Sequence, residues 1–125
     1  MKIVLLISLA GVTGTLSRYF MVKCINSLLP DFPWGTLAVN ILGAFIAGFA
    51  SVWLKNQFAA FAEYFPVLFI GFLGAFTTFS TFALESANFI AAGAYGKFML
   101  NIVLQNFTGI GGAAGGLYLA KLLFK

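Results

Sequence analysis

The sequence contains no histidine, a single cysteine and only three carboxylate side chains, Asp31, Glu63 and Glu85, among its 125 residues. With so few of these groups, one chain cannot assemble a catalytic triad, a histidine and cysteine metal cluster or a pair of facing carboxylates. Cys24 has no second cysteine with which to form a disulfide within the chain, and we interpret it as a structurally indifferent thiol. The composition therefore argues against an enzyme.

Charge is equally scarce, because 8% of the residues are charged and 62% are hydrophobic. Soluble globular domains carry about 25% charged residues, so this chain has too little polar surface to be one. Apolar stretches of roughly 20 residues, the length that crosses a bilayer, occur four times. We predict an all-α membrane protein with a single domain over residues 1–125 and four transmembrane helices at approximately residues 3–22, 35–54, 65–92 and 97–124.

The net charge of +4 comes from seven lysines and arginines that lie mainly near the ends of the predicted spans. This placement indicates contact with lipid headgroups rather than with nucleic acid. The first apolar run is longer than the core of a signal peptide, about 7–15 residues, so we interpret it as a span. In a helix, Gly11, Gly14 and Arg18 share one face, which predicts that Arg18 points into protein or water; alternatively, it extends to the membrane interface.

The second predicted span carries a stripe of small and polar residues around Asn40. An amide side chain inside hydrocarbon needs hydrogen-bond partners, and an intramembrane asparagine commonly joins two helices. The fourth span has amides and a hydroxyl at Asn101, Gln105 and Thr108, on one helical face. The pair Gly112 and Gly116, four residues apart, is typical of close helix packing and of helix dimers.

The third predicted span contains the most unusual stretch, because residues 71–82 combine glycines with alternating phenylalanine and hydroxyl side chains. Glycine loosens a helix, and hydroxyl groups bend it by bonding to the backbone. A broken helix at membrane depth is tolerated only where it is buried in protein or lines a polar cavity. We therefore predict that the third helix is broken and that the break marks an ion site.

Residues 74–82 read Gly-Ala-Phe-Thr-Thr-Phe-Ser-Thr-Phe. This run resembles the third-span signature of the Fluc (CrcB) fluoride channels, Gly-Gly-x-Thr-Thr-Phe-Ser-Thr-Phe, with Ala75 at the second glycine. Residues 11–19 are similar to the first-span motif of the same family, through Gly11, Gly14, Arg18 and Tyr19. The second-span motif is matched by Pro33, Gly35, Thr36, Val39, Asn40 and Gly43.

The resemblance implies a fluoride-selective channel that exports fluoride passively, with the ring edges of Phe79 and Phe82 facing the ion. The positive edge of a phenyl ring suits an anion, although phenylalanines at helical spacing are more often packing residues. Glu85 lies either near a pore mouth or in a capping or solvent-facing position. We predict an ion pathway along Asn40, Phe79, Ser80, Thr81, Phe82 and Gln105, with Arg18 in a vestibule.

Where the helix is broken, several carbonyls lose their intrahelical partners. In the resembling channels, a structural sodium ion binds carbonyls at positions matching Gly74 and Thr77, so we expect sodium as the cofactor at the centre of a dimer. Water or nearby hydroxyl groups could satisfy the same carbonyls instead.

Four spans are too few to enclose an ordinary channel, and the resemblance implies an antiparallel, dual-topology homodimer. The cationic residues favour this, because four (Lys2, Lys55, Lys121, Lys125) fall on one side and three (Arg18, Lys23, Lys97) on the other. We expect a multi-pass protein of the cell inner membrane, with fluoride, lipid and a second copy of the chain as partners. The alternatives are a small multidrug exporter, whose first-span glutamate is missing here, and a nontransporting assembly subunit.

Overall fold

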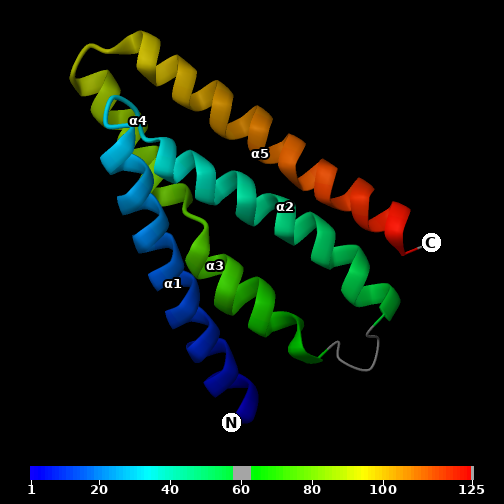
Figure 1. Cartoon of the computed structure of the whole chain (residues 1–125). Helices are drawn as coiled ribbons and strands as arrows, with labels where there is room; N and C mark the ends of the chain where they lie inside the picture. Colours follow the sequence, from blue (N-terminus) through cyan, green and yellow to red (C-terminus); the bar gives the residue numbers. More distant parts are fainter. Residues whose placement is uncertain (58–62, 125) are drawn as a thin grey trace.

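The computed structural model describes residues 1–57 and 63–124, and its described elements are helical (Figure 1). The first helix extends beyond the predicted first span, to Leu28. The elements are α1 (Lys2–Leu28), α2 (Trp34–Gln57), the π-helical segment η2 (Val67–Leu73), α3 (Gly74–Phe76), α4 (Phe79–Ala91) and α5 (Tyr95–Leu123).

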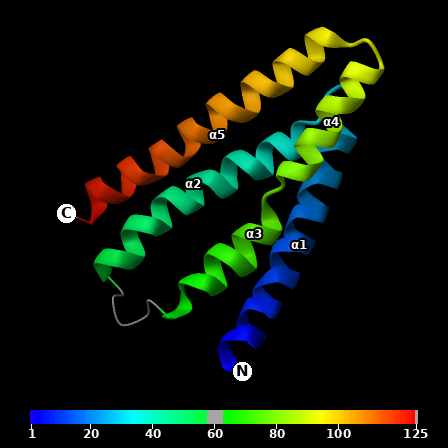
Figure 2. The ribbon, with the colours of Figure 1, turned by 180° about the vertical axis from the view of Figure 1, so that it is seen from behind.

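The chain crosses the molecule four times (Figure 1). Helix α1 runs away from the N-terminus and α2 returns; η2, α3 and α4 together make the third crossing, and α5 returns again. Consequently α2 and α5 run in the same direction, as do α1 and the third crossing (Figures 1 and 2). The connections at residues 29–33 and 92–94 lie at one end of the molecule, and both termini lie toward the other.

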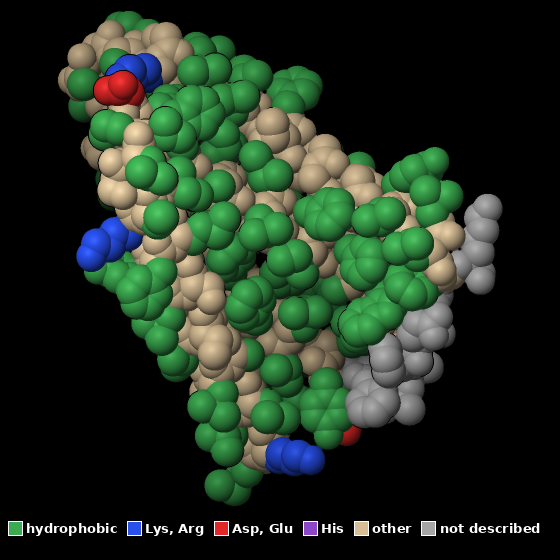
Figure 3. All heavy atoms as spheres, in the orientation of Figure 1, with side chains coloured by type: hydrophobic (Ala, Val, Ile, Leu, Met, Phe, Trp, Pro, Cys, Tyr) green, Lys and Arg blue, Asp and Glu red, His purple; other side chains and the backbone are tan. Residues whose placement is uncertain are grey.

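Three described segments are long and apolar enough to cross a membrane: Lys2–Leu28, Trp34–Leu54 and Val67–Ala91. Helix α5 has 29 residues, which is long enough, but its amides and glycines make it less apolar. The fourth transmembrane helix therefore remains an expectation. Hydrophobic side chains cover most of the face seen in Figure 3, and the charged side chains visible there lie mainly at its margins.

Helices α2 and α5 approach each other closely because glycines face backbone atoms across their contact. A side chain at Gly116 would collide with the carbonyl oxygen of Phe45, and one at Gly48 would collide with that of Ala113. A Cβ at Gly112 would lie 3.1 Å from the carbonyl oxygen of Ile41, which is a tight contact but not a collision. The pair Gly112 and Gly116 thus packs two helices of one chain, whereas the sequence pattern alone also allowed a dimer contact.

Lysines at both ends of the molecule bind neighbouring elements. Lys97 Nζ, near the start of α5, donates to the carbonyl of Asp31 over 2.8 Å, beside the connection between α1 and α2. At the other end, Lys2 Nζ lies 3.5 Å from Tyr64 Oη and over the Tyr64 ring. Lys2 and Lys97 thus lie at opposite ends of the molecule, as the assignment of cationic residues to two sides assumed. Lys125 and most of the linker after α2 are outside the described residues.

Candidate functional site

The third crossing is broken at two residues, Thr77 and Thr78, which have extended backbones. Their φ and ψ angles are −86° and 158° for Thr77, and −151° and 109° for Thr78. The predicted break is confirmed, and it divides α3 from α4. The π-helical geometry of η2 just before it was not predicted, because the sequence of that segment is an ordinary apolar run.

Threonine side chains close the two helix ends at the break. The hydroxyl of Thr77 and its backbone N–H both donate to the carbonyl of Leu73, each over 2.9 Å. The Thr78 hydroxyl accepts from the N–H of Thr81 over 3.2 Å and lies 2.9 Å from the Thr81 hydroxyl oxygen. Thr78 is therefore the N-cap of α4, which explains why the sequence restarts a helix immediately after the break.

Asn40 on α2 binds the backbone of the break with its side-chain amide. Its Oδ1 accepts from the N–H of Thr78 over 2.8 Å, and its Nδ2 donates to the carbonyl of Thr78 over 3.1 Å. Both backbone polar groups of one extended residue thus find partners in a region without bulk water. This contact agrees with the alternative in which an intramembrane asparagine joins two helices.

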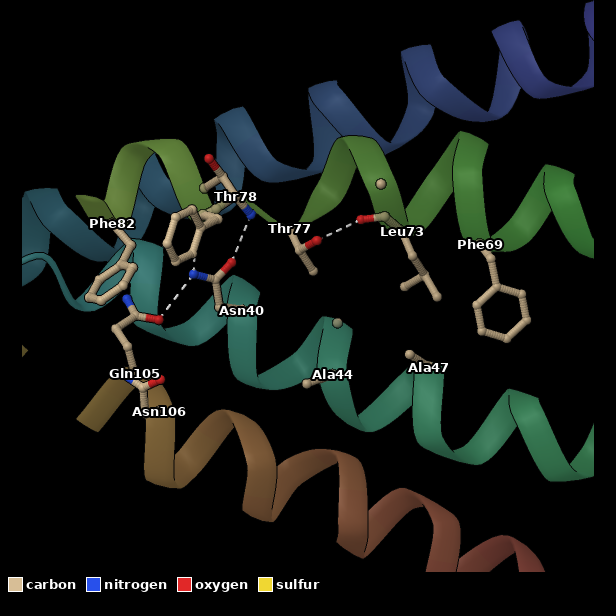
Figure 4. Close-up of a pocket in the computed structure, with 13 residues that line it drawn as sticks. Asn40, Ala44, Ala47, Phe69, Leu73, Thr77, Thr78, Phe82, Gln105 and Asn106 are labelled. Atoms are coloured by element: carbon tan, nitrogen blue, oxygen red, sulfur yellow. Dashed lines mark hydrogen bonds between the residues drawn. The ribbon is translucent and has the colours of Figure 1, made fainter. Parts of the chain in front are cut away.

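The same Asn40 amide also contacts α5, because its Nδ2 donates to Gln105 Oε1 over 3.0 Å (Figure 4). The other end of the Gln105 amide, Nε2, is buried and has no hydrogen-bond partner among the described residues. Gln105 as a whole is only 8% exposed. A buried donor without an acceptor is costly, so this nitrogen calls for an explanation.

A cavity of about 420 Å³ lies at the break between α2, the third crossing and α5 (Figure 4). No Asp or Glu is among its lining residues in the part of the chain that the structure describes. It brings together four of the six predicted pathway residues and both predicted sodium ligands. These six lining residues are Asn40, Gly74, Thr77, Phe79, Phe82 and Gln105.

Phe79 and Phe82 meet edge to face in the wall of this cavity. Their ring centroids are 5.5 Å apart and their planes are inclined by 66°. Phe82 is 8% exposed, whereas Phe79 is 78% exposed on the surface of the single chain. Phe76, one turn earlier, is buried and stacks on Phe72, as expected for a packing residue.

The remaining predicted site residues lie elsewhere. Thr81 and Arg18 line a second cavity of about 340 Å³, together with Tyr19, Lys23, Thr36 and Thr78. Arg18 is therefore half-buried beside a cavity. Ser80 is exposed and lines neither of the two cavities; its hydroxyl lies 3.4 Å from that of Thr78.

The polar residues of α5 do not form a continuous track. Asn101 is fully buried and donates to the Ser86 hydroxyl over 3.0 Å, and the Thr108 hydroxyl bonds the carbonyl of Leu104 in its own helix. Only Gln105 of the three reaches the cavity at the break, where Asn106 joins it. Asn106 was missed, because its exposed helical position gives no signal in the sequence.

The backbone at the break leaves two carbonyls without their usual helical donors. In a continuous helix, the N–H of Thr78 would donate to Gly74 and the N–H of Thr81 would donate to Thr77. Here Thr78 N–H donates to Asn40 and Thr81 N–H donates to the Thr78 hydroxyl. Because oxygen atoms are the ligands that hard cations prefer, the carbonyls of Gly74 and Thr77 fit a small cation.

Comparison with known proteins gives the family. Residues 5–117 match the family described as "CrcB-like protein, Camphor Resistance (CrcB)". The chain belongs to the CrcB family. It is 38% identical over 118 residues to the "Fluoride-specific ion channel FluC" of Desulforapulum autotrophicum, with 94% of each chain covered.

Two further relatives carry the same name. The FluC protein of Solidesulfovibrio magneticus is 40% identical over 118 residues, which are 94% of each chain. That of Legionella pneumophila is 44% identical over 103 residues, which are 82% of this chain and 77% of the relative. The resemblance to this family is thereby confirmed. Because the chain belongs to this channel family and contains three apolar helices long enough to cross a membrane, it is a multi-pass membrane protein and not an enzyme.

Proposed function

We propose that this CrcB protein is a fluoride-selective channel that lets fluoride leave the cell passively. The observation that carries the proposal is the cavity at the break, which has amide side chains and phenyl rings in its wall and belongs to a chain similar to proteins named fluoride-specific channels. Fluoride is a small anion, so a selective pore must replace its water with donors and present no negative charge.

Each part of the cavity wall has a separate contribution in this mechanism. Gln105 offers an amide N–H, and Asn40 holds the broken segment beside it. Phe79 and Phe82 present ring edges, which are the positive part of the ring quadrupole. Thr81 and Arg18 line the second cavity, where the Arg18 cation would attract the anion. Ser80 is exposed on the surface of the single chain.

We propose that two chains form an antiparallel homodimer in the cell inner membrane. Phe79 is 78% exposed in the single chain, which leaves one wall of the pathway open. A second copy would cover that ring and complete the wall. The near balance of four cationic residues against three on the two sides supports insertion in both orientations.

A structural sodium ion fits the break, and the carbonyls of Gly74 and Thr77 would hold it. The donors that a continuous helix would give them are used by Asn40 and by the Thr78 hydroxyl. When bound, the ion would supply a positive charge to these carbonyls, which would otherwise lack partners at membrane depth. Two antiparallel chains meeting at their breaks would provide such carbonyls in symmetric pairs.

The two other classes are less well supported. A small multidrug exporter needs a membrane-embedded glutamate in its first span, and the segment Lys2–Leu28 contains none. A nontransporting assembly subunit would need the glycine contacts between α2 and α5 but not a cavity at a broken helix.

The deciding experiment is a recording with a fluoride electrode on liposomes that hold the purified protein and a fluoride gradient. We expect rapid fluoride release once the membrane potential is clamped, and no comparable release of chloride from matched liposomes. Fluoride release no faster than from protein-free liposomes would overturn the proposal.

A further inference from the structure

A third cavity, of about 300 Å³, lies toward the end of the molecule that holds the N-terminus, between the start of α1 and the residues that lead into the third crossing. Lys2, Ile3, Glu63 and Tyr64 line it. A single water needs only about 10–15 Å³, so this cavity is large enough for a bigger polar group. Among the described residues, it shares no lining residue with the cavity at the break.

The wall of this third cavity carries one positive and one negative side chain. The Lys2 ammonium lies 3.5 Å from the Tyr64 hydroxyl oxygen and 5.9 Å from the centre of the Tyr64 ring. An ammonium has three N–H donors, so two remain for a ligand beside that contact. In the part of the chain that the structure describes, no ion pair joins Lys2 to Glu63. Both charges are therefore available to a ligand in the cavity.

The third cavity lies where two membrane-spanning segments begin. Lys2–Leu28 and Val67–Ala91 are both long and apolar enough to cross a membrane, and the lining residues stand at or just before their first turns. Beyond the cavity, α1 and η2 run side by side (Figures 1 and 2). Val4 on α1 and Ile70 on η2 are 63% and 66% exposed. A lipid with its headgroup in the cavity would thus meet apolar surface with its acyl chains.

We propose that the third cavity binds the headgroup of a phospholipid that carries both a phosphate and a primary ammonium, a phosphatidylethanolamine. The Lys2 ammonium donates to the phosphate, and the Glu63 carboxylate accepts from the ammonium of the lipid. Such charge-assisted hydrogen bonds are stronger than those between neutral groups. This inference goes beyond the proposed channel and does not depend on it.

The Glu63 carboxylate decides between the headgroups. An anionic phosphatidylglycerol brings a phosphate for Lys2 but no cation for Glu63, so its negative charge is repelled by the carboxylate. The quaternary nitrogen of phosphatidylcholine has no N–H to donate to Glu63, and the Tyr64 ring that could attract it already faces Lys2. Of the three headgroups, only ethanolamine offers a partner to each charged side chain.

Native mass spectrometry of the purified full-length protein in detergent tests this preference, because each retained lipid adds its own mass. The protein receives equal amounts of phosphatidylethanolamine, phosphatidylglycerol and phosphatidylcholine with identical acyl chains. We expect phosphatidylethanolamine to be retained about fivefold more than either competitor, the effect of roughly one charge at a membrane surface. Equal retention of the three lipids, or a preference for phosphatidylglycerol, would overturn the proposal.

Substitutions separate the two charges of the site. Glu63→Gln should remove most of the preference for phosphatidylethanolamine over phosphatidylglycerol, and Lys2→Gln should lower the retention of phosphatidylethanolamine itself. Lys97→Gln is the matched control, because Lys97 lies at the opposite end and donates to the carbonyl of Asp31. The readout in detergent does not depend on the orientation in which a variant inserts. If Glu63→Gln keeps the wild-type preference, or Lys97→Gln lowers it equally, the preference does not come from this cavity.

Water-soluble O-phosphoethanolamine distinguishes a lipid from a free headgroup, since it has the same charged groups but no acyl chains. At the concentration of the lipid, it should displace no measurable phosphatidylethanolamine, because it gains nothing from the apolar surface at Val4 and Ile70. Displacement at equal concentration would overturn the assignment to a lipid and favour the free compound.

Discussion

The hydroxyl of Thr36 donates to Glu85 Oε1 over 2.6 Å, which joins the first turn of α2 to the middle of α4. The second carboxylate oxygen, Oε2, is buried and has no partner among the described residues. This pair connects elements 49 positions apart in the chain, beside the cavity that Thr36 shares with Arg18. Glu85 is therefore neither a helix cap nor a solvent-facing carboxylate, which were the alternatives to a position near the pore mouth.

Thr36→Val should destabilise the protein, because it removes the hydrogen bond from a partly buried carboxylate. The expected loss is about 1.5–3 kcal/mol, the usual contribution of a hydrogen bond to a charged group. Thermal loss of monodispersity in detergent would measure it. Glu85→Gln keeps an acceptor for Thr36 and should be milder; equal losses in both variants would contradict the argument.

Gly116→Ala should weaken the packing of α5 on α2, since the new methyl group would collide with the carbonyl oxygen of Phe45. Overpacking of this kind costs about 1–3 kcal/mol. The matched control is Gly96→Ala, because no atom lies within 4 Å of a Cβ at Gly96 and alanine favours the helix. If the Gly116→Ala variant is as stable as Gly96→Ala in a thermal unfolding assay, α5 can shift away from α2 without loss of stability, and the argument is wrong.

The sequence predicted the break because the signal is local: hydroxyl groups and glycines act on the backbone within a few residues. It could not assign the partners of those groups, because they come from distant elements. Asn101 and Gln105 share a helical face, yet Asn101 meets Ser86 on α4, and Gln105 meets Asn40 on α2. Which residue of a polar face reaches the cavity depends on where α4 begins, and only the packed structure shows that.

Phe79→Ile and Phe82→Ile should each reduce fluoride efflux by about tenfold or more, while the protein stays folded. Isoleucine keeps apolar bulk but lacks the positive ring edge. Phe89→Ile, on the same helix but stacked on Phe32 instead, is the control and should conduct nearly normally. If efflux remains normal in both cavity variants, the two rings are packing residues only.

Dual topology should appear as labelling from both sides of the membrane. Cys24 is exposed, so the test needs a Cys24→Ser background before Asn56→Cys is introduced near the end of α2. An impermeant maleimide should label comparable fractions from outside and, after permeabilisation, from inside. Labelling from one side alone would exclude the antiparallel dimer.

Two or three added lysines at one end should bias the orientation, because the native difference is only one charge, four minus three.

Removal of sodium should weaken the dimer or its activity, because other groups near the break are already used. The Thr77 hydroxyl donates to Leu73, and the Thr78 hydroxyl is engaged with the N–H and hydroxyl of Thr81. These hydroxyls are therefore poor substitutes for a cation at the carbonyls of Gly74 and Thr77.

The sodium measurement compares protein exchanged thoroughly into a large organic cation with protein kept in sodium. The readouts are the dimer fraction in size-exclusion chromatography and fluoride efflux from liposomes. We expect at least one of them to fall and to recover when sodium is restored, because a bound ion stabilises only the state that holds it. If neither the dimer fraction nor the efflux depends on sodium, water is the partner of the Gly74 and Thr77 carbonyls, and the proposed anion pathway stands without the ion.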